Sequence, residues 1–582
     1  MTTHPDPTTP TARPDAGPAA EAAPAHAPPA APATLCDALL ARRSDPRIAL
    51  VADDGERWSW AELVRHAAAW GEALDRHRGP GPFHVGLLME NLPAYVFALC
   101  GAALRGATVV GLNPTRPPDG IARDARLADC SLVVADDALG PLLDAAPLDV
   151  AVVTPDDLAV AEGPSAPAGE PAPVAPEALY SLIFTSGTSG DPKAVRCTQG
   201  TLVRRAARII GLTDLGPDDV VYLSMPLFHS NALVAAFAPW AVVGARLALR
   251  RRFSASAFLD DVRRHGATYA NYVGKPLSYV LAQPERPDDA DNRLRVVLGN
   301  EASDLDITAF ARRFGCQVLD FYGSSEGGVS LARTPDTPPG SLGRSADDVR
   351  VLDPVTGREC ERARFVDGRL ANVAEAVGEL VNVSGRGTFE GYYGDGEADA
   401  ERLRDGWFWT GDLAYRDEDG FVYFAGRGGD RIRVDGENMA LGPIERVLHR
   451  HPDVVAVAAY PVADPAAGDQ LMVALDLRDG AAFDPVAYAA WLDAQADLGT
   501  KARPRFARVV DELPLSASNK VRKRDLAAEG WWSGSTWWRP PGADAYEPVD
   551  GAVRAALAAA FTRHGRSHLG EPVPAPTPEA AR

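Results

Sequence analysis

Apolar runs alternate with amphipathic stretches along the first quarter of the chain. Ser59 and Glu62 form a capping box ahead of the first amphipathic stretch, which predicts a helix start. The apolar runs that read as strands cover residues 47–54, 84–91, 107–113 and 131–136, and the helical patterns cover 60–74, 93–106 and 121–130. Continuously apolar strands that alternate with helices are typical of parallel sheets covered on both faces, so the pattern predicts an α/β fold.

The chain divides into segments of different composition. Its 582 residues exceed what one hydrophobic core usually holds. Residues 1–33 are almost entirely Ala, Pro, Thr, Asp and His, so this Pro/Ala-rich tail is expected to be disordered. A second break at 424–433 precedes a series of short α and β elements. We therefore expect a large N-terminal domain over 34–428, a small C-terminal α/β domain over 429–540 and a tail over 541–582.

Two apolar segments raise the question of membrane contact. Residues 232–245 are shorter than the roughly 20 residues that span a bilayer, so a buried helix is expected. The four tryptophans of the segment 531–538 could anchor at a lipid interface, but packing against the small domain is the favoured alternative. The N-terminus lacks the basic start and apolar core of a signal peptide.

Composition narrows the classes of partner. The formal net charge of −20 argues against a nucleic-acid-binding face, which needs a basic surface, but it allows a small anion in a local positive pocket. The six cysteines form neither a CxxC pair nor a metal-ligand cluster. Scattered cysteines of this kind favour a reducing cytoplasm.

The loop FTSGTSGDPKAV, residues 184–195, has the composition of a phosphate-binding loop. Gly187 and Gly190 let the backbone turn its N–H groups toward an anion, and Lys193 adds a positive charge. Hydroxyl donors come from Thr185, Ser186, Thr188 and Ser189. The loop is not a Walker A motif, because Lys193 follows Asp191-Pro192 and precedes alanine. A flexible Ser/Gly linker is the alternative, although an apolar strand precedes the loop and a helix follows it.

Six ordered segments resemble the motifs of the adenylate-forming superfamily, which contains acyl-CoA synthetases, peptide-synthetase adenylation domains and luciferases. They are TSGTSGDPKAV (185–195), PLFHS (226–230), DFYGSSEG (320–327), the segment 407–430 around WTGD, VDGENMALGPIE (434–445) and LPLSASNKVRKRDL (513–526). The resemblance covers about residues 34–540. The segments 250–284 and 298–315 further resemble the branch of fatty-acid transport proteins and very-long-chain acyl-CoA synthetases. The resemblance implies a large domain hinged to a small one.

The resemblance also implies an ATP site. Tyr322 would stack on adenine, Asp412 would accept from the ribose hydroxyls, and Ser325 would reach the α-phosphate. Glu326 would hold Mg²⁺, since hard cations take carboxylate oxygens. The nucleotide-binding residues are therefore expected to be Thr185, Ser186, Gly187, Thr188, Ser189, Gly190, Lys193, Gly299, Asn300, Glu301, Tyr322, Gly323, Asp412, Arg427 and Gly436.

The expected catalytic residues are Lys520, Glu326, Ser325 and His229. By resemblance, Lys520 lies between the substrate carboxylate and the α-phosphate during adenylation, where its ammonium offsets the repulsion of two anions. His229 would lie beside the acyl pocket. The small domain would then rotate about Gly429, which replaces Lys520 with the segment 435–439 for transfer of the acyl group to coenzyme A.

Three functions fit these residues. The leading hypothesis is a ligase that joins a long-chain or aromatic acid to coenzyme A with ATP. The first alternative is a diazotase of specialised metabolism that adenylates nitrite and transfers it to an aromatic amine. Lys275 and Ser278, on the acyl side, could narrow or polarise the pocket for such a substrate. A non-catalytic AMP-binding or lipid-sensing relative is disfavoured, because the charged residues named above are all present.

Overall fold

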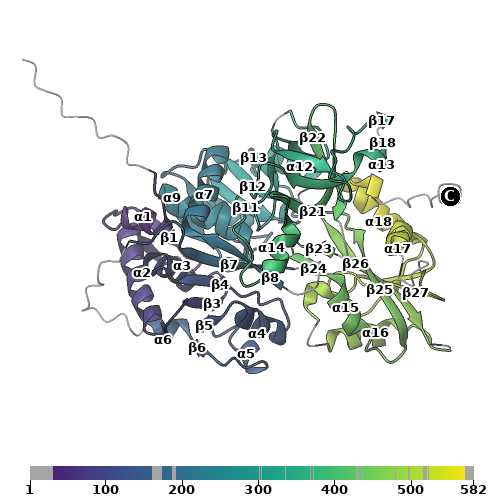
Figure 1. Ribbon diagram of the computed structural model, residues 1–582, viewed down its shortest axis with the longest axis horizontal. Helices are drawn as coiled ribbons and strands as arrows, with labels where there is room; N and C mark the ends of the chain where they lie inside the picture. The colour runs from purple at the N-terminus through teal and green to yellow at the C-terminus, as the bar shows by residue number, and fades with distance from the viewer. Residues whose placement is uncertain are drawn as a thin grey trace, which may run out of the picture.

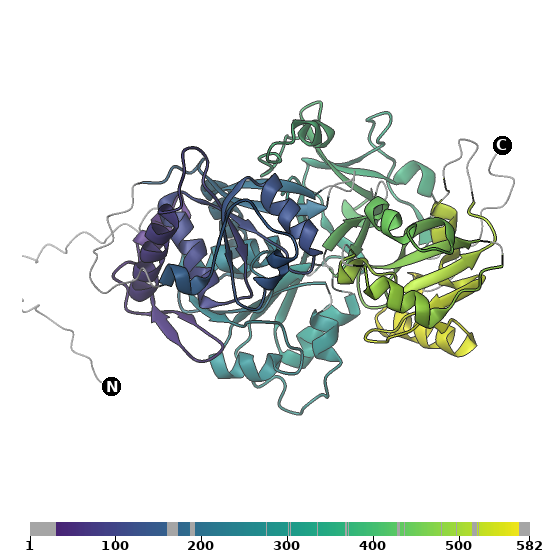
Figure 2. The same cartoon turned by 90° about the horizontal axis from the view of Figure 1, so that it is seen from below.

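The computed structural model describes most of the chain. The described residues are 31–159, 173–186, 192–274, 276–300, 302, 304–334, 336–366, 369–370, 372–427, 431–435, 437–478, 480–495, 498–514, 521 and 523–569. Three sheets form a large domain, and a smaller domain that contains the later part of the chain packs beside it (Figures 1 and 2). Residues 1–30 of the expected N-terminal tail lie outside the described part.

The first sheet contains the predicted alternation of strands and helices. Its order is β6-β5-β3-β4-β7-β8, and all neighbours are parallel except β7 and β8. The strands are β3 (His84–Leu88), β4 (Thr108–Gly111), β5 (Cys130–Ala135), β6 (Ala151–Val153), β7 (Leu179–Ser186) and β8 (Pro192–Thr198). The helices that follow them are α3 (Pro93–Arg105), α4 (Pro118–Leu127), α5 (Pro141–Asp144) and α6 (Pro155–Ala159). The predicted α/β fold is confirmed.

The second sheet has the order β14-β13-β12-β11-β9-β10-β1-β2 and antiparallel edges. Its strands are β1 (Ile48–Val51), β2 (Arg57–Ser59), β9 (Val220–Leu223), β10 (Arg246–Leu249), β11 (Tyr269–Val273), β12 (Val296–Asn300), β13 (Gln317–Gly323) and β14 (Ser330–Ala332). Strand β1 pairs in parallel with β10, where Val51 lies opposite Ala248. The apolar pattern predicted this strand but not its partner, because either sheet can bury an apolar strand.

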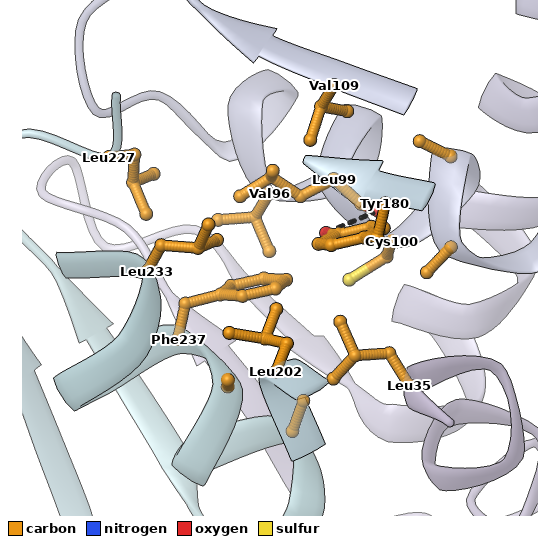
Figure 3. Close-up of a cluster of buried hydrophobic side chains, with 14 of the residues drawn as sticks. Leu35, Val96, Leu99, Cys100, Val109, Tyr180, Leu202, Leu227, Leu233 and Phe237 are labelled. Carbon is orange, nitrogen blue, oxygen red and sulfur yellow. Dashed lines mark hydrogen bonds between the residues drawn. The ribbon is translucent and has the colours of Figure 1, made fainter. Parts of the chain in front are cut away.

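One hydrophobic core joins the two sheets. It combines strand residues of both with helices α1 (Leu35–Leu40), α2 (Trp60–Asp75), α3, α7 (Gln199–Thr213) and α9 (Ala238–Val243). Figure 3 shows Leu35, Val96, Leu202 and Phe237 around Tyr180, whose hydroxyl donates to the Leu99 carbonyl over 3.1 Å. Helix α2 begins with the predicted capping box of Ser59 and Glu62. The core therefore holds two sheets in one rigid frame, on which the loops at the strand ends are positioned.

The third sheet is antiparallel, which differs from the expectation of parallel-sheet subdomains. It consists of β15 (Ser341–Arg344), β22 (Phe421–Arg427), β21 (Trp407–Arg416), β19 (Gly378–Asn382) and β16 (Val349–Leu352), with β20 (Leu403–Arg404) paired to β21. A short turn over 417–420 joins β21 to β22, and strands joined so tightly can pair only in the antiparallel sense. Its outlying elements are β17 (Phe365–Val366), β18 (Arg369–Leu370), α13 (Val373–Ala376) and α14 (Gly396–Arg402).

Three further helices belong to the large domain. They are α10 (Phe258–His265), the short α11 (Pro276–Leu281) and α12 (Asp304–Phe314), which pack on the second sheet. Their apolar side chains form a satellite core on the outer face of that sheet, next to Tyr222 and Tyr272.

The small domain starts with a hairpin of β23 (Arg431–Val434) and β24 (Glu437–Ala440). A mixed sheet follows in the order β25 (Val454–Ala463), β26 (Asp469–Leu477), β27 (Phe506–Val510), β28 (Ser535–Trp538) and β29 (Glu547–Pro548). Its helices are α15 (Leu441–Leu448), α16 (Pro485–Asp493), α17 (Lys523–Glu529) and α18 (Gly551–Arg563). Strand β24 lies beside β7 of the large domain.

The tryptophan-rich segment packs inside the small domain. Trp531 is buried and stacks on Trp532, with ring centroids 4.0 Å apart, and Phe561 of α18 lies on the same core. The packing alternative is therefore confirmed for Trp531. Residues 541–569, expected to form a tail, contribute β29 and α18 to this domain, because Leu557 and Phe561 have apolar surface that the sheet covers.

The apolar run 232–245 is a buried helical segment, as predicted. It contains the end of α8 (Ser230–Ala232), a π-helical turn η1 (Leu233–Phe237) and α9. In the part of the chain described above, no helix is long and apolar enough to cross a bilayer. All six cysteines are free thiols.

Candidate active site

A cavity of about 430 Å³ opens where strands of all three large-domain sheets end. This volume lies within the usual range for small-molecule sites. The predicted site residues on its wall are Thr185, His229, Asn300, Gly323, Ser325, Glu326 and Asp412. Segments separated by more than 200 positions in the sequence therefore meet around one space.

Part of the cavity wall is apolar. It includes Ile183, Ile209, Phe228, Val234, Ala235, Val273, Phe321 and Val329. Val234 and Ala235 belong to the π-helical turn η1, and the Tyr269 hydroxyl donates to the Ala235 carbonyl over 2.5 Å. Such turns widen a helix and are frequent at functional sites. The apolar wall suits the hydrocarbon part of a ligand.

His229 lies at the boundary between the apolar and polar walls. It caps α8, where its Nδ1 accepts from the Asn231 backbone N–H over 3.2 Å. The next residue, Ser230, has its hydroxyl 3.0 Å from that of Ser325. The residue that follows His229 in the sequence therefore contacts the serine that is predicted to bind phosphate.

Glu326 is a buried carboxylate that accepts a hydrogen bond from the Tyr392 hydroxyl over 3.0 Å. Burial alone would raise the pKa of this carboxyl, but the charge of Arg402 and hydrogen bonds from Ser324 and Tyr392 hold its pKa below the ordinary value. Glu326 is therefore ionised at neutral pH and presents negative charge to the cavity.

Arg205 of α7 fixes the loop that carries Ser325 and Glu326. Its guanidinium donates to the carbonyls of Ser325 over 2.9 Å and Glu326 over 2.8 Å, and to the Thr388 hydroxyl over 3.0 Å. These contacts hold the loop backbone against the segment that follows β19, so the two side chains keep fixed positions in the cavity.

Tyr322 and Asp412 lie on facing strands, β13 and β21. The Tyr322 hydroxyl donates to Asp412 Oδ2 over 2.6 Å. Arg427 is the register partner of Asp412 at the end of β22. The predicted adenine-stacking and ribose-binding residues thus belong to one connected group.

Asn300 lies in a buried network of amides. Its Oδ1 accepts from Asn231 Nδ2 over 3.1 Å, and its own Nδ2 donates to the Phe321 carbonyl over 2.6 Å. Gly299 is not among the residues that line the cavity, and a Cβ there would lie 2.3 Å from the Tyr272 carbonyl oxygen. Of the two neighbours, Asn300 is the one that lies on the cavity wall.

The phosphate-loop prediction falls partly on described residues. Thr185 lines the cavity, and Ser186 ends β7. Lys193 is buried in β8, where its Nζ lies 3.0 Å from Glu401 Oε2 and 5.5 Å from the centroid of the Tyr392 ring. Gly187, Thr188, Ser189 and Gly190 lie outside the described residues.

Other predicted residues also lie outside the described part of the chain. They are Glu301, Gly436, Lys520, the hinge residue Gly429 and the acyl-side residue Lys275. Ser278 is described, but its hydroxyl donates to Asp306 over 2.8 Å and the residue does not line this cavity. It therefore does not polarise the pocket as expected.

Family comparisons agree with this arrangement. The family described as AMP-binding enzyme matches residues 39–393, and the AMP-binding enzyme C-terminal domain matches residues 443–520. The chain belongs to the AMP-binding enzyme family. The predicted membership of the adenylate-forming superfamily is confirmed, and the C-terminal match covers the segment in which Lys520 lies.

Named relatives narrow the comparison. A steroid-22-oyl-CoA synthetase of Rhodococcus jostii is 46% identical over 550 residues, 92% of this chain and 98% of that protein. A medium/long-chain fatty acid–CoA ligase of Mycobacterium marinum is 49% identical over 484 residues, 82% of this chain and 93% of that protein. A long-chain fatty acid transport protein of mouse is 28% identical over 537 residues, 86% of this chain and 85% of that protein. The fatty-acid transport proteins, whose branch the sequence was found to resemble, are thus among these relatives.

A solved structure supports the fold. An o-succinylbenzoate CoA synthetase from Bacillus subtilis, bound with a product analogue, matches with a TM-score of 0.70 and 25% identity, over 84% of this chain and 98% of that chain. The fold class is thereby confirmed.

Two residues near Glu326 were missed by the sequence reasoning, Tyr392 and Arg402. Both lie between motifs, in the segment EGYYGDGEADAERLRDGW. The tyrosine pair 392–393 just before a helix was the available signal for the first. No such sequence signal pointed to Arg402, since an arginine in a charged helix is most often exposed.

Proposed function

We propose that the protein activates an apolar carboxylic acid with ATP and transfers the acyl group to coenzyme A. The observation that carries this proposal is the cavity, which joins an ionised Glu326, Ser325 and Asp412 to an extended apolar wall. The polar part suits a nucleotide, and the apolar part suits an acyl chain or ring system. The carboxylate would lie where the two parts meet, near His229.

The names of the relatives support the acid class. Proteins nearly half identical to this one carry the names steroid-22-oyl-CoA synthetase and medium/long-chain fatty acid–CoA ligase. We propose the same range of acids here, namely medium- to long-chain fatty acids and the carboxylated side chains of steroids. These names give no support to nitrite and an aromatic amine as substrates.

The residues would act in two steps. In the first, the carboxylate attacks the α-phosphate and pyrophosphate leaves; Ser325 would donate to the phosphate, Asp412 would hold the ribose, and Lys520 would lie between the reacting anions. In the second, the coenzyme A thiol displaces AMP. Strand β24 contains residues of the segment 435–439 and lies beside β7, so in this structure that segment faces the large domain. A rotation about Gly429 would exchange it for Lys520 between the two steps.

Mg²⁺ fits the donors that the site offers. Among the described residues, no three His, Cys, Asp or Glu side chains are grouped to hold a metal ion. Mg²⁺ is commonly held by one or two carboxylates together with substrate phosphates, and the ionised Glu326 supplies one carboxylate. The bound ion would offset negative charge on the nucleotide phosphates. The six free cysteines support the reducing cytoplasm expected from the sequence.

ATP–pyrophosphate exchange with a panel of acids tests the proposal. The panel would contain fatty acids of increasing length, a steroid side-chain acid, an aryl carboxylate and nitrite, with coenzyme A consumption followed in parallel. We expect exchange and acyl-CoA formation with the fatty acids or the steroid acid. Exchange with nitrite alone, without consumption of coenzyme A, would overturn the proposal.

A further inference from the structure

Arg402 is a buried cation at the end of α14. Its exposed fraction is 8%, and it lines the cavity together with Glu326 and Asp412. Its Nε lies 3.3 Å from the Tyr392 hydroxyl, and its Nη1 lies 3.3 Å from the Trp409 carbonyl oxygen. Both of these partners are neutral oxygen atoms.

No direct ion pair of Arg402 is found among the described residues. None of them has a carboxylate oxygen within 4.0 Å of the guanidinium, although Arg116, Arg313 and Arg416 have such partners. The charges of Glu326 and Asp412 act on Arg402 only from a longer distance. Buried charges in proteins are usually paired, because removing an ion from water is costly. A buried guanidinium that faces a cavity without a direct carboxylate contact therefore indicates an anionic ligand.

The backbone makes room for this guanidinium. Gly411, in the TGD turn, has a φ of +74°, and a Cβ at this position would lie 2.6 Å from Arg402 Nη1. Any larger residue at 411 would push the arginine out of its place. The turn that presents Asp412 to the cavity therefore also admits Arg402.

Resting on the proposed function, we propose that Arg402 binds phosphate oxygens of ATP. The guanidinium is permanently charged and planar, so it suits two phosphate oxygens at once. Tyr392 joins it to Glu326, since the phenolic oxygen can accept from Arg402 while its hydrogen points to the carboxylate. Arg402 would thus offset the phosphate charge from the side of the third sheet, while Lys520 approaches from the small domain.

Ligand binding tests this assignment directly. Arg402→Gln removes the charge but can still donate to the Tyr392 and Trp409 oxygens. We expect the Kd of this variant for ATP to rise about tenfold or more, with the Kd for adenosine unchanged, because adenosine lacks the phosphates. Adenylation, measured by pyrophosphate exchange, should fall on the order of 10²-fold. Calorimetry with and without EDTA would measure both ligands.

Controls separate the possible outcomes. Arg404→Gln removes a cation two residues away that pairs with Glu379 over 3.0 Å and does not line the cavity, so its ATP affinity should stay unchanged. Loss of ATP affinity in Arg402→Gln should persist in EDTA; a loss seen only with Mg²⁺ would mean that Arg402 acts through Glu326 and would overturn the assignment. Unchanged ATP affinity in the folded variant would overturn it too.

A second variant keeps the test possible if Arg402→Gln fails to fold. If Arg402→Gln does not fold, Arg402→Met is tested in the same way, since its apolar side chain needs no hydrogen-bond partner at this buried position. A wild-type protein that binds neither ATP nor adenosine would refute the proposed function itself, and with it the role of Arg402. A wild-type protein that binds ATP, with a variant that binds it equally well, would refute the role of Arg402 alone.

Discussion

The Tyr322 hydroxyl donates to Asp412 Oδ2 over 2.6 Å and joins the second sheet to the third beside the cavity, whose wall includes Asp412. A short hydrogen bond to a carboxylate fixes the orientation of both groups. Asp412 lines the cavity, where its carboxylate would accept from a ligand hydroxyl. The two residues would therefore bind adenine and ribose as one unit.

Tyr322→Phe is expected to weaken ATP binding about tenfold, because it keeps the ring but removes the group that orients Asp412. Steady-state kinetics with varied ATP would measure this change. Tyr415→Phe is a matched control, since Tyr415 lies on the same strand as Asp412 but stacks on Tyr423 outside the cavity. A KM for ATP that stays within twofold in Tyr322→Phe would contradict the joint role.

Lys520→Ala is expected to abolish the first half-reaction and spare the second. Pyrophosphate exchange should fall on the order of 10²–10³-fold, because one positioned charge is lost at the reacting centre. Transfer from a supplied acyl-adenylate to coenzyme A should remain. Lys523→Ala is the control, because Lys523 pairs with Glu445 over 3.0 Å and its loss should affect neither half-reaction. Equal loss of both half-reactions in Lys520→Ala would sink the assignment.

Asp124 makes the stability of the large domain depend on pH. Its carboxylate is buried near Arg116, with 3.2 Å between Oδ2 and Nε. Burial raises the pKa of Asp124 to about 6, against the opposing charges of Arg116 and Arg123. Because the folded pKa exceeds the unfolded one, the folded protein binds more protons between these two values. The contribution of Asp124 to the free energy of unfolding therefore falls as pH rises through that window.

Asp124→Asn should remove this dependence. The free energy of unfolding of the variant, relative to the wild type, should increase by up to roughly 3 kcal/mol between about pH 4 and pH 7. Denaturant unfolding at several pH values would measure it. Asp119→Asn is the control, because Asp119 is exposed on the same helix and should leave the profile unchanged. Parallel profiles for Asp124→Asn and the wild type would disprove the linkage.

Gly299→Ala should destabilise the second sheet. The added Cβ would lie 2.3 Å from the Tyr272 carbonyl oxygen, so neighbouring strands would have to separate. Overpacking of this kind typically costs about 1–3 kcal/mol. Gly211→Ala in α7 is the opposite case, because nothing lies within 4 Å of the new Cβ and alanine favours helices. In thermal unfolding, the melting temperature should be highest for Gly211→Ala, intermediate for the wild type and lowest for Gly299→Ala. Any other order would contradict the steric argument.

Local sequence patterns predicted those features of the fold and the site that depend on residues close together in the chain. The capping box of Ser59, the strands of the first sheet and the ordered motifs around Glu326 and Asp412 all follow from short segments. Contacts between distant segments were not predictable in this way. Lys193 meets Glu401 across 208 positions, and Tyr322 meets Asp412 across 90 positions. Such contacts depend on the packing of three sheets, which no local pattern records.

The pairing of β1 with β10 has a consequence during synthesis. Val51 and its partner Ala248 are separated by nearly 200 residues, so β1 leaves the ribosome long before the strand that completes its hydrogen bonds. At the usual 5–20 residues per second, the interval is about 10–40 s. For that time an apolar strand edge is open to wrong partners. Strand β2 can cover one edge of β1 early, but the other edge waits for β10. Slowed translation or chaperone depletion should therefore harm the yield of this protein more than that of a protein whose first strand has all its partners nearby in the sequence.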